Sequence, residues 1–201
     1  MNDRPYHHGD LRRAILTAAL DVIATDGPTG LSLRDLARRA GVSHAAPAHH
    51  FRDRTGLLTA IAAEGHGLLA TALAEAADLR EAGARYVRFA REHPAHFQVM
   101  FSPGLLRADD LELTTARALS AAALTDAIAT TAPPPTSTSA PAPAPAPAGD
   151  GTDARRARIA VWSLAHGFAT LLLGHNLDGL LGDEDPEEVF RALPMNLFPS
   201  A

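Results

Sequence analysis

The twenty residues from Ser32 to Phe51 constrain the fold of this chain more than any other segment. Ser32 can cap a short helix whose leucines and alanines recur at helical spacing, and this helix ends at Gly41, where a left-handed residue is needed. Ser43 then stands in the position of a second N-cap, which predicts a new helix from there to Phe51. The small side chain of Ala37 lets the two helices approach each other. Two short helices joined in this way form a helix-turn-helix, whose second helix can lie in the major groove of DNA. A plain helical packing unit has the same pattern and remains an alternative.

The distribution of charge favours the DNA interpretation. The chain has 201 residues and a formal net charge of −5. Residues 1–60 hold eight arginines and six acidic residues, a net of +2, together with five histidines. The remaining residues hold ten arginines and 17 acidic residues, a net of −7. A surface that binds a polyanion is therefore expected in the N-terminal third.

Composition excludes several other classes of protein. The chain contains no cysteine, which rules out disulfides, thiolate metal sites and a cysteine nucleophile, and which fits a cytoplasmic protein. Its first residues are polar and lack the apolar run of a signal peptide. No stretch of about 18 uninterrupted apolar residues exists, so no association with a membrane is expected.

Nearly all of the remaining sequence has helical periodicity, so the predicted fold class is all-α. A three-helix DNA-binding headpiece is predicted over 1–54, with a connector helix capped by Asp53 that ends near Leu79, and an effector-binding and dimerisation domain over 55–201. The alternating Ala-Pro repeats at 132–151 predict a disordered linker. Pro194 is expected to kink or shorten the last helix. The other predicted helices cover about 9–25, 80–92, 94–101, 109–130, 153–176 and 187–198.

The helix predicted over 153–176 is apolar around most of its circumference, so most of it must be buried. One of its rows contains only small residues and lets a second helix come close. These residues are Ala160, Ser163, Gly167, Thr170 and Gly174. We expect a homodimer in which the two C-terminal helices of each chain form a four-helix bundle.

The N-terminal sixty residues resemble the DNA-binding domain of the TetR family of bacterial transcriptional regulators. The matching motifs are Ser32-Leu-Arg-Asp-Leu-Ala, Ala40-Gly-Val-Ser and His50-Phe-Arg-Asp-Arg. The C-terminal part resembles a class of ligand-binding domain marked by Trp, His and Gly in one helix, here Trp162-Ser-Leu-Ala-His-Gly. The resemblance implies a dimeric repressor that binds an inverted repeat in double-stranded DNA and is released by a small, largely apolar effector. The sequence contains no Gly-rich phosphate loop and no Gly-x-Ser-x-Gly nucleophile elbow, so no cofactor and no enzymatic activity are expected.

The resemblance also assigns DNA-binding roles. Residues at the start of the recognition helix would face base edges, namely His44, Ala45 and Ala46. Others would contact phosphates, namely Ser32, Arg34, Ser43, His49, His50 and Arg54. The chain departs from the family at Ala48, where tyrosine is usual, and at Pro47, which is expected to cost a helical hydrogen bond and distort the helix. An alternative is therefore a dimeric interaction scaffold with an impaired helix-turn-helix, which would not bind duplex DNA even at low salt.

Aromatic and sulfur-containing side chains of the C-terminal part could line an effector pocket, although each could equally belong to the core. The candidates are Phe89, Phe97, Met100, Phe101, Trp162 and His166. A core histidine bonded to a backbone carbonyl is an equally good interpretation of His166. The ten histidines are scattered and none has a carboxylate at zinc-ligand spacing, so no metal site is predicted. An enzyme using His166 as a base would lack an evident acid or nucleophile.

Overall fold

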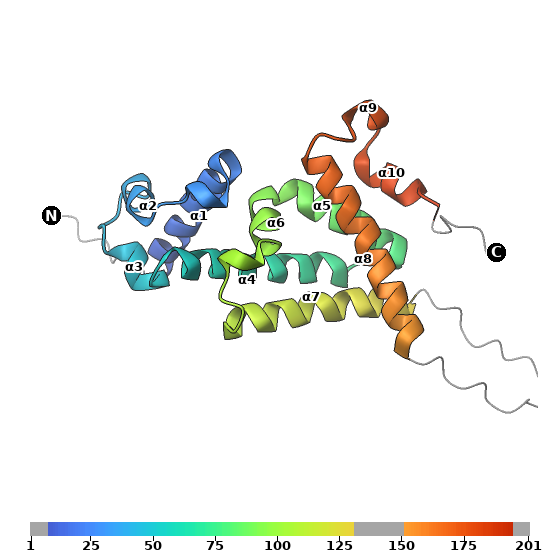
Figure 1. Ribbon diagram of the computed structural model, residues 1–201, viewed down its shortest axis with the longest axis horizontal. Helices are drawn as coiled ribbons and strands as arrows, with labels where there is room; N and C mark the ends of the chain where they lie inside the picture. The colour runs from blue at the N-terminus through green and yellow to red at the C-terminus, as the bar shows by residue number, and fades with distance from the viewer. Residues whose placement is uncertain (1–7, 131–150, 195–201) are drawn as a thin grey trace, which may run out of the picture. The chain divides into compact units, whose positions relative to one another are not determined.

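The structure is a computed structural model that describes residues 8–130 and 151–194 (Figure 1). Within these ranges the chain forms ten α-helices and two 3-10 turns and has no strand, so the all-α prediction is confirmed. The linker predicted over 132–151 lies, except for its last residue, outside the described residues.

The chain divides into two compact units, and the division differs from the predicted boundary at residue 54. The first unit comprises the chain up to Leu68 and residues 93–119, and the second comprises residues 69–92 and the chain from Ser120 onward. The first unit therefore includes helices from the middle of the chain in addition to the headpiece. Sequence periodicity could not reveal this, because it reports which face of a helix is apolar and not which helix covers that face.

The first unit contains the predicted headpiece and the elements that pack on it. Its core consists of aliphatic side chains of α1, α2 and α4, such as Ile15, Leu36 and Ile61, which are fully buried. A Cβ atom at Gly65 of α4 would lie 2.6 Å from the sulfur of Met100, so glycine permits the close approach of α4 and α6. The elements of this unit are α1 (His8–Asp26), η1 (Pro28–Gly30), α2 (Leu33–Arg39), α3 (Ala46–Phe51), the first part of α4 (Arg54–Ala74), α6 (Pro94–Met100), η2 (Pro103–Leu105) and the first part of α7 (Leu111–Thr130).

The second unit is organised around α5, which packs against both α8 and α10. The inner face of α5 contains Gly83, where a Cβ atom would lie 2.2 Å from the ring of Phe190 on α10. Phe190 also meets Phe168 of α8 edge to face, with 5.4 Å between the ring centroids. The elements of this unit are the ends of α4 and α7 together with α5 (Leu79–Glu92), α8 (Gly151–Leu173), α9 (Asp178–Leu181) and α10 (Pro186–Ala192).

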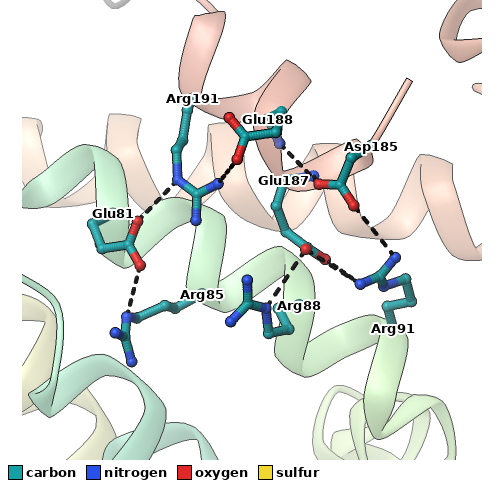
Figure 2. Close-up of polar contacts among 8 residues, drawn as sticks. All are labelled: Glu81, Arg85, Arg88, Arg91, Asp185, Glu187, Glu188 and Arg191. Atoms are coloured by element: carbon teal, nitrogen blue, oxygen red, sulfur yellow. Dashed lines mark hydrogen bonds and ion pairs between the residues drawn. The ribbon is translucent and has the colours of Figure 1, made fainter.

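An ionic network joins α5 to α10 along the edge of this contact (Figure 2). The Arg191 guanidinium lies 2.9 Å from Glu81 and 2.7 Å from Glu188. Glu187 is only 3% exposed and pairs with Arg91 at 2.9 Å and with Arg88 at 3.5 Å. We name these two sets of contacts the α5–α10 ionic network. No local sequence pattern predicts this network.

Several predicted helix ends are confirmed and others are wrong. The connector helix α4 ends at Ala74 and not near Leu79. A separate helix, α5, begins at Leu79, and Asp78 caps it by accepting a hydrogen bond of 2.8 Å from the Glu81 N–H. The short helix α9 was not predicted. The last helix is shorter than predicted and ends at Ala192, just before Pro194, as the expected effect of the proline requires.

Of the described helices, α4 alone is long and apolar enough to cross a membrane. Just over half of its most apolar window, 56%, is buried inside the protein. The central helix of a globular core meets the same criterion, and α4 supplies core side chains such as Leu57 and Ile61 to the first unit.

Candidate DNA interface and effector site

The turn between α2 and α3 has the predicted helix-turn-helix geometry. Gly41 is left-handed, with φ of 66°, and its N–H bonds to the carbonyl of Arg38. The N–H of Val42 bonds to the carbonyl of Ala37 at 3.0 Å. These two bonds are those of a Schellman motif, which satisfies the last carbonyls of a helix. Ala37 is completely buried, as expected of a small residue at the corner.

The second helix begins later than predicted. α3 runs from Ala46 to Phe51 and its N-cap is Ala45, so the prediction of Ser43 as N-cap is wrong. The carbonyl of Ser43 instead accepts a hydrogen bond of 3.0 Å from the Ala46 N–H. Pro47 therefore lies in the first turn of the helix, where a missing N–H leaves no helical bond unmade. The predicted distortion by Pro47 is wrong for this reason.

The predicted DNA-binding residues differ in how far their side chains reach solvent. Five of them have exposed side chains, which are open to a ligand, namely Arg34, Ser43, His44, Ala45 and His49. Those of Ser32 and His50 are half-buried. Ala46 is only 8% exposed and its methyl group packs inside the headpiece, whereas its contact with a base edge stays a prediction. Exposed Arg52, which the sequence analysis did not select, directly follows α3.

The predicted role of Arg54 as a phosphate contact conflicts with its position. Its side chain is half-buried, and Nη2 donates a hydrogen bond of 2.6 Å to the carbonyl of Pro28 in η1. The guanidinium thus ties the start of α4 to the turn between α1 and α2. A motif match alone could not distinguish this internal anchor from a phosphate contact.

Three of the predicted effector-site residues lie in the first unit. Phe97 and Met100 are buried and Phe101 is half-buried, and the two phenylalanine rings are 5.0 Å apart. His66 of α4 meets the Phe101 ring edge to face at 6.4 Å. Burial, assisted by the nearby positive charge of Arg117, lowers the pKa of His66 to about 4.

The other three candidates lie in the second unit. Phe89 is buried, His166 is half-buried, and Trp162 is 44% exposed. The Nδ1 atom of His166 lies 2.9 Å from the hydroxyl of Tyr86, so one partner of this histidine is a phenol. Burial lowers the pKa of His166 and raises that of Tyr86. Tyr86 was missed because, on sequence, it is one more apolar position of its helix.

The described part of the chain contains no group of three or more histidine, cysteine, aspartate or glutamate side chains that could hold a metal ion.

Two family models match the chain. One, described as "Bacterial regulatory proteins, tetR family", matches residues 15–61. The other, described as "Tetracyclin repressor-like, C-terminal domain", matches residues 79–195. No curated protein matches. The resemblance of the C-terminal part to the Trp-His-Gly class is not tested by these matches and stays a prediction.

Several solved structures resemble the chain over nearly its whole length. A protein of unknown function from Rhodococcus sp. RHA1 is 35% identical, covers 94% of this chain and 94% of its own, and has a TM-score of 0.67. Two more distant structures show the shared fold. A bacterial regulatory protein of the tetR family from Rhodococcus RHA1 is 19% identical, covers 90% of each chain and has a TM-score of 0.62. PfmR, a TetR family transcriptional regulator from Thermus thermophilus, is 22% identical, covers 89% of this chain and 93% of its own, and has a TM-score of 0.55. The chain therefore belongs to the TetR family of DNA-binding transcriptional regulators.

Proposed function

We propose that the protein acts in the cytoplasm as a homodimeric repressor, that it binds an inverted-repeat operator, and that a small, largely apolar effector releases it. The two headpieces of the dimer would read two half-sites spaced by about one helical turn of DNA, roughly 34 Å, or a multiple of it.

The observation that carries this proposal is the exposed polar surface at the start of α3. Ser43, His44 and Ala45 precede the helix without being covered, and His49 is exposed one turn further on. Because the N-terminal end of a recognition helix is the part that contacts base edges, these side chains are in a suitable position to contact DNA. Exposed Arg34 on α2 adds a cation that can contact a phosphate.

The proposed dimer is supported by the outer surface of α8. Its small residues Ala160, Ser163 and Thr170 are exposed, and nothing lies within 4 Å of the position that a Cβ atom would take at Gly167. Large apolar side chains of the same helix are also exposed, namely Ile159, Trp162 and Leu171. An exposed apolar helix of this kind gains free energy when a second copy covers it.

The proposed effector response requires two states of the dimer. An effector can release the operator only if it binds the released state more tightly than the bound one. In the second unit, Phe89 and Trp162 supply apolar groups, and the hydrogen-bonded pair of Tyr86 and His166 supplies polar ones. An apolar lining with a few polar groups is typical of small-molecule sites.

Selection of bound sequences from random duplex DNA tests the central part of the proposal. We expect a palindromic sequence, and an affinity that falls steeply between roughly 50 and 200 mM salt because bound counterions are released. An absence of duplex binding at low salt would refute the proposal and favour the scaffold alternative.

Sedimentation at micromolar concentration tests the dimer. Replacing Gly167 by Leu should shift the protein toward monomer, because the side chain would occupy the proposed contact between the two copies. Gly179 of α9 is a matched control, since it also has open space around it. Gly179→Leu should leave the dimer intact, and a monomeric unaltered protein would contradict the proposal.

A further inference from the structure

The chain reverses direction between α3 and α4 at a strained residue. Arg52 has φ of 69° and ψ of −58°, and the N–H of Asp53 bonds to the carbonyl of Phe51 at 2.8 Å. These values define a tight γ-turn, a conformation that is rare and unfavourable for a residue with a side chain. Such a backbone conformation costs on the order of 1–3 kcal/mol and persists only where the surrounding structure holds it.

The carboxylate of Asp53 holds one side of this corner. Its Oδ1 atom accepts a hydrogen bond of 2.8 Å from the Gly56 N–H, which caps α4. Its Oδ2 atom pairs with Nη2 of Arg107 at 2.7 Å. The Gly56 N–H first, and then the Arg107 guanidinium, hold the pKa of Asp53 below its usual value, so the carboxylate is charged at neutral pH.

Arg107 reaches this corner from a distant part of the sequence, the segment between η2 and α7. Its own backbone N–H donates a hydrogen bond of 3.0 Å to the hydroxyl of Thr59, which is buried. The Thr59 hydroxyl in turn donates to the carbonyl of Thr55 at 2.7 Å. The backbone of Arg107 is thus fixed on α4, and its guanidinium reaches the aspartate that follows the strained residue.

The chain is closely packed around Gly56 at this corner. A Cβ atom at Gly56 would lie 2.1 Å from the carbonyl oxygen of Phe51 and 2.7 Å from Nη1 of Arg107. The end of α3, the start of α4 and the Arg107 side chain are therefore packed against one another.

We propose that Arg107 is a positioning residue for DNA binding, which holds the strained corner at Arg52 and so fixes α3 on α4 without contacting DNA itself. The inference rests on the proposed use of α3 as the recognition helix. It also connects the segment between η2 and α7 to the end of that helix, because Arg107 pairs with Asp53, the residue that directly follows the strained Arg52.

The first test compares Arg107→Gln with the unaltered protein on two duplexes, the sequence selected from the random library and a scrambled duplex of equal length. A displaced helix loses base contacts and keeps phosphate attraction. We therefore expect the affinity for the selected duplex to fall about three- to fivefold, the value of one half-exposed ion pair, with the scrambled duplex unaffected. Asp53→Asn keeps a capping side chain but loses the charge, so it should lower the affinity for the selected duplex by the same factor as Arg107→Gln. The double variant should lose no more of this affinity than either single variant.

Arg13→Gln is the matched control. It removes the same charge and an ion pair of 2.8 Å with Glu64 in the same unit, but away from the corner. In this variant the ratio of the affinity for the selected duplex to the affinity for the scrambled duplex should be unchanged. If Arg107→Gln lowers both affinities and reduces the salt slope by about 2, one contact from each chain of the dimer, Arg107 is a phosphate contact and the proposal is overturned.

The second test needs no DNA and so separates this proposal from the proposed function. Trypsin cleaves after arginine, and Arg52 is exposed at the corner. If Arg107 holds the corner, Arg107→Gln should accelerate cleavage after Arg52 several-fold, measured by mass spectrometry, with cleavage at distant arginines unchanged. An equal rate in both proteins would overturn the proposal even if the protein binds DNA.

Discussion

The headpiece in the first unit and the α5–α10 contact in the second are held together in different ways. The turn between α2 and α3 is closed by hydrogen bonds between residues at most five positions apart, such as the bond from Val42 to Ala37. The α5–α10 contact is fixed by side chains far apart in sequence, and Arg191 and Glu81 are 110 positions apart. Local bonds of the first kind can be predicted from residue types alone, whereas the second kind depends on which faces the fold brings together.

The two regions also differ in where their charges lie. The core of the headpiece is aliphatic, and its arginines are on the outside or at its corners. At the α5–α10 contact an acidic side chain, Glu187, is almost fully buried between two arginines. A buried ion pair adds little net stability but strongly disfavours any arrangement that separates its partners. The ionic network should therefore fix the position of α10 more than it increases the stability of the second unit.

The largest effect is expected where the α5–α10 contact is apolar. Phe190→Ala removes a ring buried against Gly83 and should cost about 3–5 kcal/mol of the free energy of unfolding. Urea unfolding measures the loss, and hydrogen exchange should show it first in α5 and α10. Leu180 of α9 is a large apolar control that is 82% exposed, and Leu180→Ala should change stability by less than about 0.5 kcal/mol. A small effect of Phe190→Ala would mean that the ionic network alone holds α10.

The next largest effect is a loss of stability of the first unit in acid, which we expect from His66. The pKa of His66 is about 4 in the folded chain, below the ordinary value of 6.5, so the folded state binds fewer protons than the unfolded state between these values. Stability from this group is complete above pH 6.5 and is lost as the pH falls toward 4, by at most about 3 kcal/mol.

Unfolding by urea at pH 7 and pH 4.5 measures this loss. His66→Leu should flatten the difference between the two pH values, whatever its effect on stability at pH 7. His49→Gln changes an exposed histidine and should leave the difference unaltered. If the stability of His66→Leu still depends on pH to the same extent, another group of the first unit must cause the dependence. His96 would be the first candidate, because burial also lowers its pKa.

A smaller effect is expected from the ionic network. Hydrogen bonding to Arg191, ahead of that to Arg85, lowers the pKa of Glu81, so its contribution is present above the unfolded value of 4.5 and is lost as the pH falls through the folded value. Arg191→Met should cost about 1 kcal/mol at neutral pH, because the pair is partly exposed and screened. The difference from the unaltered protein should shrink in 1 M salt and in acid. A loss that is independent of salt would indicate that Arg191 acts through packing.

The smallest effect separates two arginines of the headpiece. Arg34→Ala should reduce the slope of DNA affinity against salt by about 2, because the homodimer loses one phosphate contact in each of its two chains. Arg54→Ala should leave that slope unchanged and should destabilise the headpiece by about 1 kcal/mol, because it breaks the bond to Pro28. Titrations at several salt concentrations and thermal unfolding distinguish the two. The reverse pattern would restore Arg54 as a phosphate contact.

The sequence predicted the elements around Gly41 and Asp53 well, because each depends on a capping residue and its immediate neighbours. It was wrong about the N-cap at Ser43 and about Pro47, because the start of α3 depends on how the turn packs. Two apolar methyl groups in neighbouring positions of a turn cannot be assigned to the inside or the outside from spacing alone. Tyr86 and Arg107 were missed for a related reason, since their partners lie on other elements and no local pattern marks them.

The sequence by itself determined an all-α chain with a helix-turn-helix, because left-handed glycines, caps and helical periodicity act within a few residues. The tertiary structure decided which of the predicted DNA-binding side chains are exposed, that Arg54 is an internal anchor, and that Arg107 reaches the end of α3. It also decided that Glu187 is buried between arginines of another helix. These outcomes depend on the directions in which side chains of distant segments point once the helices have packed, and short sequence patterns carry no information about those directions.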